Sequence, residues 1–107
     1  MIITVSEEIN APRERVWKIV TDIDGWTETI SGIVAIDVIN RPASGIIDLK
    51  WRETRVLFGK EAVETMWITA AEENGWYETR AENHGAIYST RISLKDEHEK
   101  TVLTMAF

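Results

Sequence analysis

The fold of this chain is decided by residues 51–68, which read WRETRVLFGKEAVETMWI. Two runs of alternating side chains flank a turn at Gly59-Lys60, and glycine in the first position of a two-residue turn is typical of a type II′ hairpin because it accepts positive φ. The cross-strand pairs predicted from this turn are Phe58 with Glu61, Arg55 with Glu64, Glu53 with Met66 and Trp51 with Ile68. Since alternate residues of a strand point to the same side of a sheet, these pairs define two faces.

Two further turns extend the hairpin into an antiparallel meander. Asn74-Gly75 is the strongest two-residue hairpin signal in the chain, and His84-Gly85 follows it. The pairs predicted from these turns include Trp67 with Glu82, Ile68 with Ala81, Ala81 with Tyr88, and Tyr77 with Ile92. Three independently placed turns therefore agree on one division of the sheet into two faces.

One predicted face is charged and belongs in water, whereas the other is largely apolar and should be concave and buried. The charged face carries Arg52, Trp67, Glu78, Arg80, Glu82 and Arg91, with Trp67 expected to stack under Arg52. The apolar face carries Trp51, Leu57, Met66, Ile68, Ala70, Tyr77, Ala81, Tyr88, Ile92 and Leu94, joined by Leu103, Met105 and Phe107 from the last strand. This inner face also holds the polar residues Glu53, Arg55, Glu64, Thr79, Asn83 and Thr90.

The remaining elements follow from periodicity and from helix-capping residues. Pro12 begins a helix whose apolar residues recur at helical spacing through about residue 21. A second short helix is predicted at residues 26–30 with Asp24 as its cap. The predicted strands cover residues 2–9, 33–40, 46–58, 61–71, 76–83, 86–95 and 100–107, with an acidic loop at 96–99 before the last one.

The amino-acid composition limits the classes of protein to which the chain can belong. A chain of 107 residues with 44% hydrophobic content can build one core, so residues 1–107 are expected to form a single domain. No apolar stretch is long enough to span a bilayer, and a formal charge of −6 argues against a nucleic-acid partner. The absence of cysteine excludes disulfides and thiolate metal sites and fits a cytoplasmic location. His84 and His98 lie in predicted turns without ligand-type spacing, so neither a metal site nor a cofactor is expected.

Four short segments, in their order along the chain, carry a family resemblance. They are INAPRERVW at 9–17, DIDGW at 22–26, WRETR at 51–55 and KTVLT at 100–104. With a strand, two short helices and six strands in sequence, the chain resembles the START-like/Bet v 1-like (SRPBCC) superfamily, and within it the polyketide cyclase/dehydrase and lipid-transport subgroup. The resemblance implies an α+β helix-grip fold, in which a curved seven-stranded antiparallel sheet carries two short helices after its first strand.

The chain departs from the superfamily pattern at its end. Members of the superfamily close with a long C-terminal helix across the concave face, whereas this sequence stops at Phe107. An uncovered apolar face of that extent is an interaction surface or an aggregation liability. The expectation is therefore that residues 1–107 belong to a longer chain or that a partner, such as a second copy in an oligomer, covers the face.

The resemblance implies a ligand cavity between sheet and helices, and two interpretations fit its candidate residues. Arg55 and Glu64, with Glu53 close by, form either a polar anchor for a ligand's carboxylate, hydroxyl or carbonyl, or an ion pair near the hairpin tip worth about 0–1 kcal/mol. The apolar candidates, which line a pocket or simply pack in the core, are Trp26, Trp51, Met66, Met105 and Phe107, and Tyr88 offers a hydroxyl beside them.

Three functions remain open from the sequence. The first is binding of a small hydrophobic or amphipathic molecule between sheet and helices. The second is a polyketide cyclase/dehydratase-type enzyme, in which the same cavity folds a substrate and a polar residue moves a proton. The third is a protein-interaction domain that uses the uncovered face of the sheet. Fold resemblance does not choose among them, because one fold hosts many functions.

Overall fold

The computed structural model of the chain describes residues 2–107 and, except for Leu57, their side chains. Seven strands form one antiparallel sheet in the order β1-β7-β6-β5-β4-β3-β2. The elements are β1 (Thr4–Ile9), α1 (Arg13–Thr21), the 3-10 helix η1 (Ile23–Gly25), α2 (Trp26–Thr29), β2 (Ile33–Asn40), β3 (Lys50–Leu57), β4 (Lys60–Glu72), β5 (Trp76–Asn83), β6 (Ala86–Glu97) and β7 (Lys100–Ala106). The predicted α+β helix-grip architecture, a seven-stranded antiparallel sheet with two short helices after strand 1, is confirmed.

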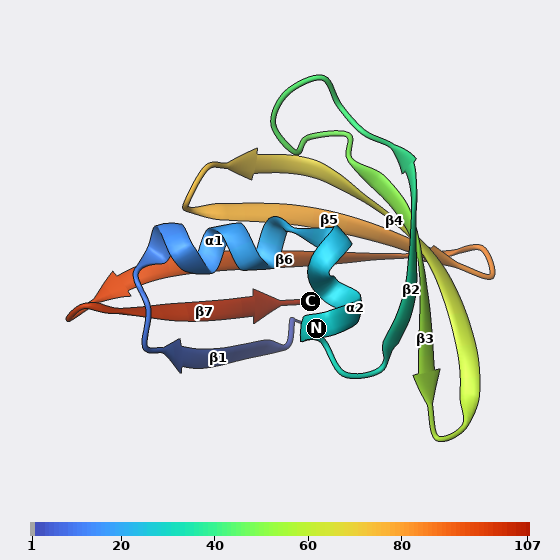
Figure 1. The fold of residues 1–107 in the computed structure, drawn as a ribbon, viewed down its shortest axis with the longest axis horizontal. Helices are drawn as coiled ribbons and strands as arrows, with labels where there is room; N and C mark the ends of the chain where they lie inside the picture. Colours follow the sequence, from blue (N-terminus) through green and yellow to red (C-terminus); the bar gives the residue numbers. More distant parts are fainter. Residues whose placement is uncertain (1) are drawn as a thin grey trace.

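The sheet is strongly curved. β2, β3 and the first part of β4 run across the direction of β6 and β7, so one side of the sheet is concave (Figure 1). α1 lies along β6 and β7 on this inner face, and α2 packs beside β2. The two helices therefore cover part of the concave face and leave the rest to side chains of the strands.

The sequence explains where α1 begins and which of its faces packs against the sheet. Pro12 occupies its N-cap with φ −68° and ψ 153°, where its missing N–H costs nothing. Glu14 in the first turn and Lys18 in the last turn complement the helix dipole. Val16 and Trp17 are buried against the sheet. The amphipathic pattern read from the sequence therefore selects the face of α1 that packs.

The predicted cap of the second helix is wrong. Residues 23–25 form a 3-10 turn that runs directly into α2, whose N-cap position is Gly25 and has no side-chain cap bond. The carboxylate of Asp24 instead forms an ion pair with Arg41, with 2.9 Å between Nη2 and Oδ2. Arg41, which is distant in sequence, thus binds the carboxylate that the local sequence pattern assigns to the N-cap of α2.

The first hairpin turns one residue earlier than predicted. Phe58 and Gly59 both adopt positive φ, 52° and 78°, which is the requirement of a type I′ turn rather than type II′. The observed cross-strand pairs are Leu57 with Lys60, Arg55 with Ala62, Glu53 with Glu64 and Trp51 with Met66. The predicted partners within the ladder are therefore wrong by two residues, while the strand residues whose side chains are described keep their predicted face because a shift of two preserves the alternation.

The second hairpin also differs from its prediction, whereas the third agrees with it. Residues 73–75 form a three-residue loop with Asn74 at φ 63°, and a bulge between Ile68 and Ala70 then restores the alternation. Near this loop Ala71, rather than the predicted Ala70, joins the core. The third turn pairs Asn83 with Ala86 as predicted. The expected acidic loop shortens to a two-residue turn at residues 98–99, because Asp96 and Glu97 belong to β6.

Aromatic side chains pack the helices against the sheet. The rings of Trp17 and Tyr77 meet edge to face with centroids 5.7 Å apart, and Trp26 meets Trp51 in the same way at 5.7 Å. The Tyr77 hydroxyl donates a hydrogen bond of 2.8 Å to the carbonyl of Val20 in α1. The prediction that Trp17 belongs to the core is confirmed.

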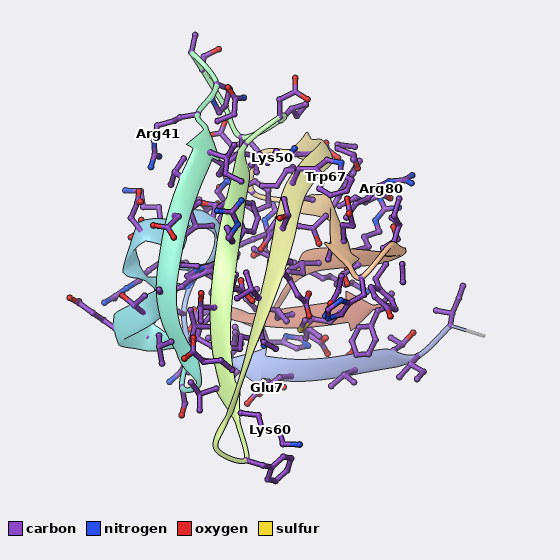
Figure 2. The ribbon with its side chains drawn as sticks, turned by 90° about the vertical axis from the view of Figure 1, so that its right-hand side faces the viewer. Glu7, Arg41, Lys50, Lys60, Trp67 and Arg80 are labelled. Atoms are coloured by element: carbon purple, nitrogen blue, oxygen red, sulfur yellow. The ribbon has the colours of Figure 1, made fainter. Side chains whose placement is uncertain are left out.

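The convex face carries the charged residues predicted for it, together with exposed apolar side chains such as Val63 and Ile87. Arg80, Glu82 and Arg91 are exposed on it. Figure 2 shows Trp67 on this face with Lys50 and Arg80 on the neighbouring strands. The cation over the Trp67 ring is Lys50, at 5.8 Å from the centroid, and not Arg52 as expected. The two-residue change of register explains the difference, since it places Lys50 directly opposite Trp67.

Candidate functional site

The inner face of the sheet divides into a covered sector and an open sector. The covered sector consists of the buried residues Trp51, Glu53, Ile68, Tyr77, Thr79, Ala81 and Leu94. Burial changes along one row of cross-strand neighbours: Trp51 on β3 and Ala81 on β5 are buried, Met66 between them is half-buried, and Tyr88 on β6 is 57% exposed. The open sector therefore begins where the helices end, on the same face and on the same strands.

The apolar part of the open sector lies across β1, β7 and β6. Its members are Ile3, Val5, Tyr88, Met105 and Phe107. Ile3 and Phe107 exchange backbone hydrogen bonds of 2.7 and 2.9 Å, and Val5 lies opposite Met105 in the ladder. Ile3, Val5 and Phe107 are 49%, 53% and 48% exposed. Large apolar side chains gathered on a concave face are typical of a binding surface.

The polar part of the open sector comes from β3, β4 and β5. Its members are Arg55, Glu64 and Asn83, all of them half-buried. Glu64 lies directly opposite Glu53, and Arg55 lies two residues further along β3 on the same face. Asn83 follows the Thr65–Glu82 pair, which places it beside Glu64 at the end of β5. Glu64 and Asn83 adjoin Met66 and Ala81, and Ala81 lies opposite Tyr88, so the polar part meets the apolar part along this row.

The carboxylate of Glu53 connects the two sectors. Its side chain is 1% exposed, whereas that of Arg55 is 44% exposed. Trp51 Nε1 donates to Glu53 Oε1 at 3.4 Å, and Arg55 Nε donates to Glu53 Oε2 in an ion pair. A buried carboxylate needs such partners, because an uncompensated charge in the core is costly. The core thereby holds the Arg55 guanidinium at the edge of the open sector.

The predicted ion pair between Arg55 and Glu64 is wrong. With Glu64 opposite Glu53, the arginine bonds to the carboxylate on its own strand. Among the described residues Glu64 takes part in no ion pair within 4.0 Å. The cause is again the two-residue change of register in the first hairpin.

The structure separates the nine predicted ligand-binding residues into two groups. Trp26, Trp51 and Glu53 are buried in the core beneath the helices. The six that meet around the open sector are Arg55, Glu64, Met66, Tyr88, Met105 and Phe107. Ile3 and Val5 were missed as site residues, because only the pairing of β1 with β7 brings them beside the others. Their alternation in the sequence predicts a strand but not its neighbour.

Two hollows lie outside the open sector. The larger, of about 370 Å³, is bounded by Trp17 of α1, residues 44–47 of the β2–β3 loop and Glu73 in the β4–β5 turn. The smaller, of about 190 Å³, lies between Lys18 and Asp22 of the α1 region and Thr29 of α2. Neither contains any of the six residues gathered around the open sector. The larger hollow lies at the margin of the covered sector, because Trp17 and Ala71, which line it, both pack on the concave face, whereas the smaller lies between the helices.

Neither a metal-binding cluster nor a membrane-spanning helix is found in residues 2–107. No three or more His, Asp or Glu side chains in this part of the chain are grouped so as to hold a metal ion. No helix in it is long and apolar enough to cross a membrane.

Comparison with known proteins identifies what the chain is similar to. The family model described as "Polyketide cyclase / dehydrase and lipid transport" matches residues 1–107. A START superfamily protein from Mycobacterium smegmatis superposes with a TM-score of 0.83 at 18% identity, over 98% of this chain and 73% of that one. The Zhui aromatase/cyclase from a Streptomyces species gives a TM-score of 0.82 at 14% identity, over 100% and 67%. Ara h 8.0201 gives 0.75 at 18% identity, over 99% and 75%. No curated protein matches the chain.

Proposed function

Because the chain belongs to the polyketide cyclase/dehydrase and lipid-transport family, we propose that its open sector binds a small amphipathic molecule. The observation that carries the proposal is the exposure of Ile3, Val5 and Phe107 on neighbouring strands of the concave face, with the exposed Tyr88 on β6 two residues beyond the position opposite Phe107. Apolar area left in water forfeits roughly 25 cal/mol per Å², so an apolar ligand gains free energy by covering it.

The proposed ligand lies with its apolar body over β1, β7 and β6 and its polar group toward β3 and β4. The half-buried Met66 and Met105 flank this path and adapt their shape to the ligand, because methionine is unbranched and flexible. Arg55 supplies hydrogen-bond donors at the polar end, while Glu64 supplies acceptors. The buried Trp26, Trp51 and Glu53 support the site from beneath and do not touch the ligand.

Binding can be tested with a dansyl-labelled alkyl probe whose fluorescence rises in an apolar environment. Tyr88→Glu places a charge in the apolar part of the open sector, and we expect it to weaken probe binding at least about tenfold. Ile87→Glu is the matched control, since Ile87 is the adjacent residue of β6 and is exposed on the convex face opposite Glu82. Equal binding by the wild type and both variants would contradict the proposed site, and absence of probe binding to the wild type would contradict the proposed function.

A second candidate is an enzyme of the cyclase/dehydratase kind, and the proximity of Arg55 to Glu64 favours it. A carbonyl oxygen that accepts a hydrogen bond from Arg55 becomes more polarised, and a nearby carboxylate can take a proton from the adjacent carbon. The test is exchange of those protons for deuterium in a bound methyl ketone, followed by nuclear magnetic resonance. Loss of exchange in Glu64→Gln with unchanged ketone binding would support the enzyme. Proton exchange no faster than in protein-free buffer would exclude the enzyme and leave ligand binding as the supported function.

A further inference from the structure

We infer that Glu64 sets the charge selectivity of the open sector, so that the bound molecule presents an uncharged polar head rather than a carboxylate. The inference rests on the proposed function and deepens it by naming the ligand's head group. An arginine in a binding site ordinarily suggests an anionic ligand. Here the residues around the arginine reverse that expectation.

The charge of Arg55 is already paired. Glu53, whose side chain is 1% exposed, accepts a hydrogen bond from Arg55 Nε and holds the guanidinium from the core side. The other oxygen of Glu53 accepts from Trp51 Nε1 at 3.4 Å, which fixes the carboxylate in one orientation. A carboxylate ligand at Arg55 would therefore compete with a buried carboxylate whose one cation among the described residues is Arg55.

Glu64 adds an uncompensated negative charge beside this pair. It lies directly across from Glu53 on the inner face and forms no ion pair among the described residues. Glu53, Arg55 and Glu64 therefore sum to one negative charge. An anionic head within reach of Arg55 would approach Glu64 at a half-buried site, where charges are less screened than in water.

An uncharged head that both accepts and donates hydrogen bonds fits the same residues without this repulsion. Its carbonyl or hydroxyl oxygen accepts from the Nη groups of Arg55, and its N–H or O–H donates to the carboxylate of Glu64. Asn83 beside Glu64 and Thr90 on β6, two further polar residues of the inner face, are neutral and supply both functions. The positions thus favour a head such as an amide or a hydroxy-carbonyl group.

The test compares two probes that share a dansyl-labelled undecyl chain and differ only at the end, where one carries a carboxylate and the other a primary carboxamide. Fluorescence titration at neutral pH and low salt gives the dissociation constant of each probe for the wild type, Glu64→Gln and Glu61→Gln. Glu61 is exposed, lies on the same strand opposite Val56 on the convex face, and its substitution removes the same charge. It is therefore a matched control for the change in net charge.

We expect the wild type and Glu61→Gln to bind the carboxamide about tenfold more tightly than the carboxylate. In Glu64→Gln the carboxylate should gain most of that factor, so that the two probes bind within about twofold of each other. Equal binding of both probes by the wild type would overturn the role of Glu64 while leaving the proposed function intact. An equal gain in Glu61→Gln and Glu64→Gln would also overturn it, by assigning the effect to net charge. Binding of neither probe would overturn the inference together with the proposed function.

Discussion

The covered and open sectors lie on one face of the same strands, yet the first is a packed core and the second is exposed. Ile68 and Tyr88 both point to the concave side, and Ile68 is fully buried while more than half of Tyr88 is in solvent. The difference comes from α1 and α2, which lie over one part of the curved sheet only (Figure 1). Alternation along a strand therefore selects a face, while the elements packed on that face decide which of its residues form core and which form a surface.

The largest effect expected from this comparison is on Ile68. Replacing it with Asp places a carboxylate in the covered sector without a partner, and we expect the free energy of unfolding to fall by at least about 4 kcal/mol. The same substitution at Tyr88, in the open sector, should cost less than about 1 kcal/mol, because the new charge stays in water. Urea denaturation measures both.

Glu82→Lys on the convex face is the control for these two variants, and a change within about ±0.5 kcal/mol is expected. Similar losses for Ile68→Asp and Tyr88→Asp would remove the distinction between the two sectors.

A smaller effect is expected at the boundary of the two sectors. Arg55→Met leaves the buried carboxylate of Glu53 without its cation, and we expect a loss of about 3 kcal/mol in the free energy of unfolding. Combining it with Glu53→Met should recover most of the loss, since apolar residues often replace a buried ion pair without cost. Arg52→Met, at the exposed position directly before Glu53 on β3, is the control. A double variant no more stable than Arg55→Met would show that packing rather than charge governs this position.

Part of the loss of stability at alkaline pH should report on the covered sector. Burial raises the pKa of the Tyr77 phenol, so the folded chain holds this proton more tightly than the unfolded chain. The resulting stability is complete below the unfolded pKa of about 10 and is lost as the pH rises from there toward the folded value, by up to about 1.4 kcal/mol per pH unit.

Denaturation with urea at about pH 9 and about pH 11 measures this alkaline loss. Lys100, whose hydrogen bond to Glu8 and attraction to its charge raise its pKa, adds to the loss in the same direction, so the comparison is between variants. Tyr77→Phe should reduce the pH dependence, and Tyr88→Phe should retain it. Identical pH dependence in the two variants would show that the buried phenol does not contribute.

The smallest expected change in the free energy of unfolding concerns the turns at the two ends of β6. The turn beyond the open sector contains Gly85 at φ 83°, whereas the turn at the other end contains Glu99 at φ 67°. A side chain at positive φ is strained, so Glu99→Gly should raise the free energy of unfolding by about 0.5–1 kcal/mol. Gly85→Glu should lower it by a similar amount through backbone strain alone, since a Cβ there would meet nothing within 4 Å. Thermal melting of both variants measures the two changes, and a destabilised Glu99→Gly would contradict the strain argument.

Sequence by itself determined the order of the elements and the two faces of the sheet. Alternation assigns the strand residues within 51–68 to a face, and a register error of two residues leaves that assignment intact; beyond Ile68 a bulge moves the core position from Ala70 to Ala71. The sequence also determined that Trp17 is core and that Arg80, Glu82 and Arg91 face water. These properties follow from local periods of 2 and 3.6 residues, which need no knowledge of distant partners.

Only the tertiary structure decided which partners meet. Gly59 is compatible with two hairpin turns that differ by one residue. The choice between them decides whether Glu64 lies opposite Arg55 or opposite Glu53. The pairing of β1 with β7 brings Ile3 and Val5 into the open sector, although these strands lie at opposite ends of the sequence. The helices then decide that Trp26, Trp51 and Glu53 are core while Tyr88 is exposed. Register, strand neighbours and cover depend on interactions between segments far apart in the chain, and for this reason the candidate site, unlike the faces that compose it, required the structure.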